Sequence, residues 1–135
     1  NTVSMNYSAY PIGITIPKGN WVMGPGAQQV TLSTSGALVN ATVTTKIVTG
    51  APASMVYCNI CYGTGAVPPL IGTPINVSGE THFVGANLND IAYQAIAVSG
   101  QVVPASAGSY WIAPCFLMTE NLTTLGSMGY IIILD

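Results

Sequence analysis

The stretch LVNATVTTKIV at residues 38–48 decides the fold class of this chain. Its odd-numbered positions are mostly apolar and share one face: Val39, Ala41, Val43 and Ile47. Its even-numbered positions between them are polar and share the other face: Asn40, Thr42, Thr44 and Lys46. A period of two is typical of a half-buried strand in an antiparallel sheet.

The same period recurs on both sides of this stretch. Further strands are predicted at residues 29–33, 55–62, 75–78, 81–84, 91–98, 110–118 and 128–134. Gly-Pro and Pro-Pro turn signals separate them, and only residues 121–127 are predicted as a short helical turn. About seven to nine strands with frequent turns indicate an all-β antiparallel sandwich, either jelly-roll or immunoglobulin-like.

Charge is almost absent from the chain. Charged residues make up 4% of the 135 positions, the net charge is -2, and there is no arginine. An average soluble domain is about one quarter charged. Nucleic-acid binding is excluded because it needs clustered Lys and Arg. Membrane insertion by a helix is also excluded, because no apolar run reaches the roughly 18 residues required. A surface without ions favours contact with copies of itself.

The two ends of the chain carry unusual strand patterns. Residues 1–17 are predicted as an extended segment preceding a sandwich domain at 18–135. Its apolar residues change phase at Tyr10-Pro11, and the predicted anchors are Val3, Met5, Tyr7, Ile12, Ile14 and Ile16. This segment either pairs with its own sheet or enters a neighbouring subunit as a donor strand. Residues 129–134 are apolar on both faces, which predicts a central strand covered on both sides.

Secretion and glycosylation are expected together. The chain begins at Asn1 instead of methionine, which is consistent with removal of a secretion signal and an extracellular location. Four Asn-x-Ser/Thr sequons fall on predicted outward or loop positions, where glycans would have to lie. The candidate glycosylation sites are Asn6, Asn40, Asn76 and Asn121.

No pattern points to catalysis, and no cofactor or metal is predicted. The only histidine, His82, shares a strand face with Glu80, which is more typical of an exposed polar pair than of a metal site. A nucleophile elbow, a phosphate loop and a dinucleotide fingerprint are all missing from the sequence. The chain is therefore not expected to be an enzyme.

The cysteines and one tryptophan are candidates for structural roles. Residues three apart on a strand face opposite sides, so a bond between Cys58 and Cys61 would be strained. A disulfide from either Cys61 or Cys58 to Cys115 would join two strands; the Cys61–Cys115 pair is favoured, with free thiols as the main alternative. Trp111 alternates with its neighbours and is the best candidate for an exposed interface aromatic.

Three segments carry a resemblance to known domains. VYCNICY at 56–62, AGSYWIAPC at 107–115 and GYIII at 129–133 resemble β-sandwich, jelly-roll-like domains of bacterial surface proteins and of phage tail-fibre C-terminal ends. The composition and the N-terminal strand are also similar to those of strand-exchanging pilins. The resemblance implies a β-sandwich in a surface structure.

Together these observations predict a structural subunit of a secreted, glycosylated, pilus-like filament. Its partners would be copies of itself, joined by β-strand contacts. The alternative is a trimeric tip domain of a surface or phage tail fibre that binds a receptor or glycan. A discrete trimer would separate this alternative from an open polymer.

Overall fold

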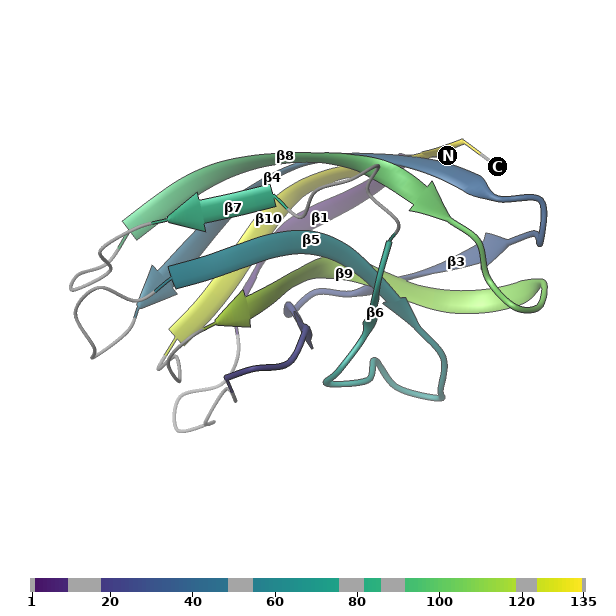
Figure 1. Cartoon of the computed structure of the whole chain (residues 1–135), viewed down its shortest axis with the longest axis horizontal. Coiled ribbons are helices and arrows are strands. Elements are labelled where there is room, and N and C mark those ends of the chain that lie inside the picture. The colour runs from purple at the N-terminus through teal and green to yellow at the C-terminus, as the bar shows by residue number, and fades with distance from the viewer. Residues whose placement is uncertain are drawn as a thin grey trace.

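Two antiparallel sheets pack face to face in the computed structural model, which describes residues 2–9, 18–48, 55–75, 82–85, 92–118 and 124–134 (Figure 1). The described residues form strands, turns and bends without any helix, so the predicted all-β sandwich is confirmed. The strands are β1 Thr2–Ala9, β2 Val22–Met23, β3 Gln28–Leu32, β4 Ala37–Val48, β5 Met55–Gly63, β6 Thr73–Pro74, β7 His82–Gly85, β8 Ala92–Val102, β9 Gly108–Met118 and β10 Thr124–Leu134.

The connectivity identifies the sandwich as a jelly roll. The first sheet has the order β1-β10-β4-β8, and the second has β9 and β5 at its centre. Short strands flank that centre, with β2 and β3 beside β9 and with β6 and β7 beside β5. The antiparallel pairs nest like one long hairpin, from β1 with β10 through to β5 with β7. This nesting is that of a jelly roll, which decides between the two sandwich types.

Pro114 accounts for the interruption between β2 and β3. β2 pairs with Cys115 and Phe116, and β3 pairs with residues 108–112, so the gap lies beside Pro114. Proline has no N–H to donate to a neighbouring strand. Its carbonyl still accepts a hydrogen bond from the Gly24 N–H at 2.7 Å. Because the backbone N–H is missing at Pro114, the ladder to β9 is interrupted there, and β2 and β3 are separate strands.

The main core lies between the sheets and takes alternate residues from the long strands. Val39 and Ala41 of β4 are buried against Ile112 and Phe116 of β9 and Ile131 of β10. This is the inward face predicted for residues 38–48, in the part whose side chains the structure describes. Burying an apolar side chain of this size contributes about 1.5–3 kcal/mol to stability.

The N-terminal strand takes the intramolecular alternative. β1 pairs with β10 of the same chain, from Thr2 opposite Ile132 to Ala9 opposite Gly126, with a register shift between Met5 and Ser8. It is an edge strand of the first sheet. Residues 10–17, which contain the predicted phase change, lie outside the described residues.

The predicted helical turn at 121–127 is wrong over its described part. Thr124 and Ser127 belong to β10 and pair with Val48 and Thr45 of β4. The ladder with β4 continues without a break to Leu134, so long-range pairing overrides the local turn signal. Residues 121–123 lie outside the described residues.

The C-terminal strand is central, as predicted, but only one of its faces is covered. β10 lies between β1 and β4, with Ile131 and Ile133 buried. Tyr130, Ile132 and Leu134 point outward and are exposed. The prediction of cover on both sides is therefore wrong for residues 130–134 of the single chain, because in its described part the second sheet packs on one face of the first.

Candidate self-association surface

The outward face of the first sheet carries a cluster of exposed apolar side chains, here termed the outer patch: Leu38, Tyr130, Ile132 and Leu134. Their exposed fractions are 56%, 59%, 42% and 63%, respectively. Alternation sends them outward because the residues between them point into the core. The register brings them together, since Leu134 lies opposite Leu38 across the β10–β4 ladder. The outer patch is therefore a contiguous feature, which marks an interaction surface more strongly than scattered apolar residues do.

A groove of about 700 Å³ crosses the same face. Its lining comes from β10, β4 and β8 and includes Leu38, Asn40, Ser99, Gln101, Ile132 and Leu134. Apolar side chains lie on the β10 side, and amide and hydroxyl groups lie on the β8 side. No lining side chain is charged, so an ionised partner group would lose hydration there without finding a counter-ion. The groove is suited to an uncharged partner.

Long, uncharged edges flank this sheet. Among the described residues, β1 is paired only with β10 and β8 only with β4. Neither strand contains a charged residue or a proline. The β4–β8 ladder runs without interruption from Ala37 opposite Val102 to Ile47 opposite Ala92. An edge that lacks charge, proline and interruption is a template for pairing with another chain.

Neither the outer patch nor the β8 edge is predicted from the sequence. The sequence contains one signal for the patch: Leu38 is an apolar residue at an even-numbered position, on the otherwise polar outward face of residues 38–48. The apolar residues of 129–134 were a second signal, although they were interpreted as covered. The edge had no local signal, because strand order is set by pairing between distant segments.

The predicted glycosylation sites are only partly described. Asn40 is exposed on β4, as its parity predicts, and it lines the groove. Asn6 belongs to β1, near the register shift. Asn76 and Asn121 lie outside the described residues. Glycosylation at all four sites stays a prediction.

The predicted interface residues of the N-terminal segment are also only partly described by the structure. Val3, Met5 and Tyr7 belong to β1, where the register sets Val3 opposite Ile131 and Met5 opposite Gly129. This places them on the same sheet as the outer patch. The other three anchors lie outside the described residues: Ile12, Ile14 and Ile16.

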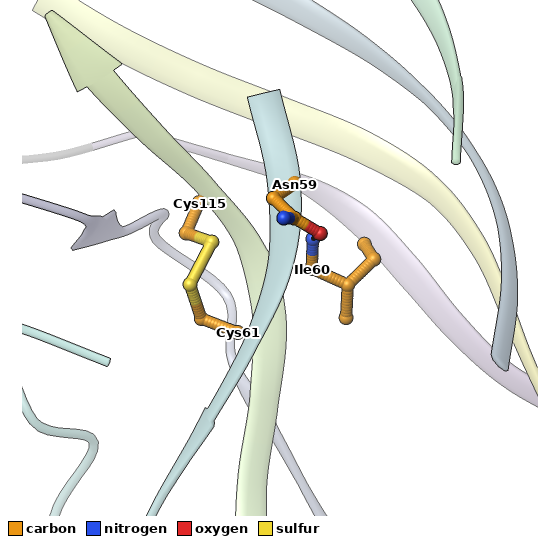
Figure 2. The surroundings of a disulfide bond; sticks show 4 residues. All are labelled: Asn59, Ile60, Cys61 and Cys115. Carbon is orange, nitrogen blue, oxygen red and sulfur yellow. Dashed lines mark hydrogen bonds between the residues drawn. A yellow bond between two sulfur atoms is a disulfide. The ribbon is translucent and has the colours of Figure 1, made fainter. Parts of the chain in front are cut away.

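On the outward face of the second sheet, the surroundings of a disulfide are covered by other residues of the chain. Cys61 of β5 and Cys115 of β9 form a disulfide with their Cα atoms 5.6 Å apart, which is the pair favoured from the sequence (Figure 2). Both are fully buried beside Met23 and Ala113, away from the main core. The disulfide therefore joins the two central strands of this sheet beneath a cover of other residues.

Trp111 contributes to that cover and is half-buried, in contrast to the exposed aromatic that was predicted. Its ring packs on the disulfide cluster. Its Nε1 donates a hydrogen bond to the carbonyl oxygen of Gly65 at 2.9 Å. The indole thus holds the loop at residues 64–72, and its place at a subunit interface stays a prediction.

Cys58 faces the main core as a free, buried thiol. Burial raises its pKa to about 12, because the thiolate would lose its hydration. A thiol that keeps its proton is a poor nucleophile and metal ligand. The adjacent Asn59 is also buried, and its Oδ1 accepts a hydrogen bond from the Ile60 N–H at 2.8 Å (Figure 2).

Other kinds of site have little support in the described part of the chain. No three His, Cys, Asp or Glu side chains gather there in a way that would hold a metal ion. No helix of that part has the length and hydrophobicity needed to cross a membrane. His82 begins β7, whereas Glu80, its predicted neighbour, lies outside the described residues.

Comparison with known proteins reveals only distant similarity. No protein-family model and no curated protein matches the chain. Two chains from structures of infectious bursal disease virus match 96% of this chain at 11% and 13% identity, with TM-scores of 0.39 and 0.38. This chain spans only 33% and 31% of those viral chains. The CBM22-1 xylan-binding domain of Paenibacillus barcinonensis Xyn10C matches 93% of this chain and 96% of its own, at 9% identity and a TM-score of 0.34. Similarities at this level assign neither a family nor an activity to the chain.

Proposed function

We propose that this protein is a structural subunit of a secreted extracellular filament whose copies join through β-strand contacts. The observation that carries the proposal is the first sheet, whose two long edges carry neither charge nor proline. Natural proteins ordinarily protect such edges against pairing with other chains. An edge left without these devices is suited to pairing. Among the described residues, β8 is such an edge along its whole length, and β1 is one apart from its register shift between Met5 and Ser8.

The composition supports the same proposal. With 4% charged residues and a net charge of -2, two copies meet little electrostatic repulsion. The outer patch lies on the face of this sheet, and a further contact between copies over that face would remove its apolar area from water and favour assembly. Backbone hydrogen bonds and apolar contacts would then hold the filament together in place of ion pairs.

The proposal is tested by placing charge at the β8 edge. Ala97→Lys combined with Ser99→Lys adds two exposed lysines to β8. The matched control combines Gln29→Lys with Thr31→Lys, which places the same charges at exposed positions of β3 on the second sheet, away from the groove and the outer patch. Each protein is made in a host without N-glycosylation, checked for folding by circular dichroism, and examined by negative-stain electron microscopy and sedimentation velocity.

Filaments are expected from the intact chain and from the β3 control, and monomers from the β8 variant. Charge on β8 opposes the arrival of another strand, whereas the same charge on β3 leaves both edges of the first sheet unchanged. An intact chain that stays monomeric at every concentration would show that the filament proposal is wrong.

Glycans at the four sequons are part of the proposal. They would supply a hydrophilic coat that the side chains, with so few charges, do not provide. Secretion from a eukaryotic host, followed by glycosidase treatment and peptide mass spectrometry, tests each of Asn6, Asn40, Asn76 and Asn121. Unmodified peptides at all four positions would remove glycosylation from the proposal.

A second candidate function, a trimeric fibre tip that binds a glycan, is favoured by the groove. Uncharged amide and hydroxyl groups beside apolar side chains are suited to a neutral sugar. Light scattering would then report a discrete trimer, and calorimetry with uncharged oligosaccharides would report binding that Gln101→Ala weakens. Open filaments, or no heat with any neutral glycan, would exclude this candidate.

A further inference from the structure

Building on the proposed function, we infer which surfaces meet in the filament. The β8 edge of one subunit pairs antiparallel with the β1 edge of the next, so that the four-stranded sheets merge into one continuous sheet. The partner is a second copy of this chain, and the contact is a backbone ladder between two different edges.

The two sheets differ in how their edges are built. At the edges of the first sheet, β8 contributes 11 residues with an unbroken ladder to β4, and β1 contributes 8 residues with one register shift between Met5 and Ser8. The outer lanes of the second sheet are short pieces, with 2 residues in β2, 5 in β3, 2 in β6 and 4 in β7. Short, interrupted strands are one of the ways in which proteins prevent edge pairing. The first sheet is therefore the one suited to growth.

Strand direction makes the two edges complementary. Every neighbouring pair in the order β1-β10-β4-β8 is antiparallel, so strand direction alternates across the sheet. With four strands, β1 and β8 run in opposite directions. A second copy laid alongside in the same orientation thus brings its β1 antiparallel to β8, and the alternation continues across the junction.

Pairing between the two different edges, β8 and β1, also explains how a filament could grow by repeated addition of subunits. A two-fold contact between two β8 edges would be antiparallel as well, but by itself it closes as a dimer, and growth would then need a second kind of two-fold contact between β1 edges. The β8-to-β1 contact uses both edges of each subunit through a single repeated junction. Contacts between different surfaces that do not close into a ring generate filaments.

The inference sets the spacing of the filament. Neighbouring strands lie about 4.7–4.9 Å apart, so a four-stranded subunit advances the merged sheet by about 19 Å. Subunits with the same orientation would therefore have equivalent residues about 19 Å apart along the sheet, before any shortening by twist.

Single-cysteine variants and a short bismaleimide test the junction. Ser99→Cys labels β8 and Ser4→Cys labels β1. The native cysteines do not interfere, because Cys61 and Cys115 are bonded to each other and Cys58 is buried. Thr31→Cys, at an exposed position of β3 on the second sheet, is the matched control for a different edge. Each variant is assembled alone and in equal mixtures with the others.

Cross-linked dimers are expected only when the Ser99→Cys and Ser4→Cys proteins are assembled together. Each variant alone should give only background cross-linking, because equivalent cysteines of neighbouring subunits lie too far apart for the short linker. Thr31→Cys mixed with Ser4→Cys should also give only background, because β3 lies on the second sheet, outside the inferred junction. Electron microscopy of the same filaments should give an axial repeat of about 19 Å or slightly less.

Other outcomes separate this inference from the proposed function. Dimers from Ser99→Cys alone would indicate two-fold β8 contacts and overturn the inference while filaments remain. Filaments without a cross-link in any mixture would also overturn it, since another surface would then form the junction. The absence of filaments from every sample would contradict both the inference and the proposed function.

Discussion

Cys58 is a residue whose chemistry depends on burial. Its pKa lies at about 12 in the folded protein, against an ordinary value of 9.0. In the unfolded chain the thiol loses its proton above pH 9, whereas the folded protein keeps it. Cys58 therefore leaves stability unchanged below pH 9. Between pH 9 and 12 stability falls by about 1.4 kcal/mol per pH unit through this group.

This pH dependence is checked with Cys58→Ala. Urea unfolding of the oxidised protein at about pH 8 and about pH 11 should show a larger loss of unfolding free energy in the wild type than in the variant. The comparison between pH values cancels the constant cost of the smaller side chain. Equal losses in both proteins would show that Cys58 is accessible to water in the folded state.

Gly72 lies against the disulfide cluster at a distance that leaves no space for a side chain. A Cβ atom there would stand 2.7 Å from the Cys61 Cβ and 2.7 Å from the Met23 Cγ. Gly72→Ala is expected to lower the unfolding free energy by about 1–3 kcal/mol, the usual cost of overpacking. Thr73→Ala, at the exposed neighbouring position, should change it by no more than about 0.5 kcal/mol. If Gly72→Ala and Thr73→Ala changed the free energy of chemical unfolding equally, the close packing around Gly72 would be contradicted.

At the scale of elements, the disulfide joins β5 to β9, the two central strands of the second sheet. Its two cysteines are 54 residues apart in the sequence. Closing a loop of that length is expected to stabilise the protein by about 4 kcal/mol, mainly by restricting the unfolded chain. Cys61→Ala combined with Cys115→Ala should lose about this amount in urea unfolding.

The reduced wild type provides the control for that variant. Its stability should approach that of the double variant, whereas reductant should leave the double variant unchanged. A double variant as stable as the oxidised wild type would show that packing, without the covalent bond, holds β5 against β9.

The elements also show where local patterns are sufficient and where they fail. Alternation correctly predicted Val39 and Ala41 as inward residues of β4, because neighbouring side chains on a strand always point to opposite sides. Turn signals at 121–127 failed at Thr124 and Ser127, because the ladder with β4 fixes those residues as strand. A residue's own sequence neighbourhood does not contain its ladder partner.

At the scale of the whole molecule, the lack of charge leads to a prediction about salt. Assembly should change little in sedimentation velocity between low and high sodium chloride, because few ion pairs are available to be screened. Apolar contacts and backbone hydrogen bonds do not depend on screening. Filaments that dissolve readily in high salt would show that charged groups hold the subunits together.

The sequence by itself determined the all-β class, the inward and outward faces of the described core strands, and a surface nearly free of charge. These are local or compositional properties, and a period of two needs no knowledge of neighbours. It also favoured the Cys61–Cys115 pair, because strand geometry argued against a bond between Cys58 and Cys61.

Only the tertiary structure decided the jelly-roll order, the outer patch, the groove and the identity of the edge strands. Leu38 and Leu134 are distant in sequence and meet only because β4 and β10 pair. β8 is an edge only because the ladder stops beside it among the described residues. Such properties depend on which distant segments lie side by side, and alternation, which repeats identically in each strand, does not encode that choice.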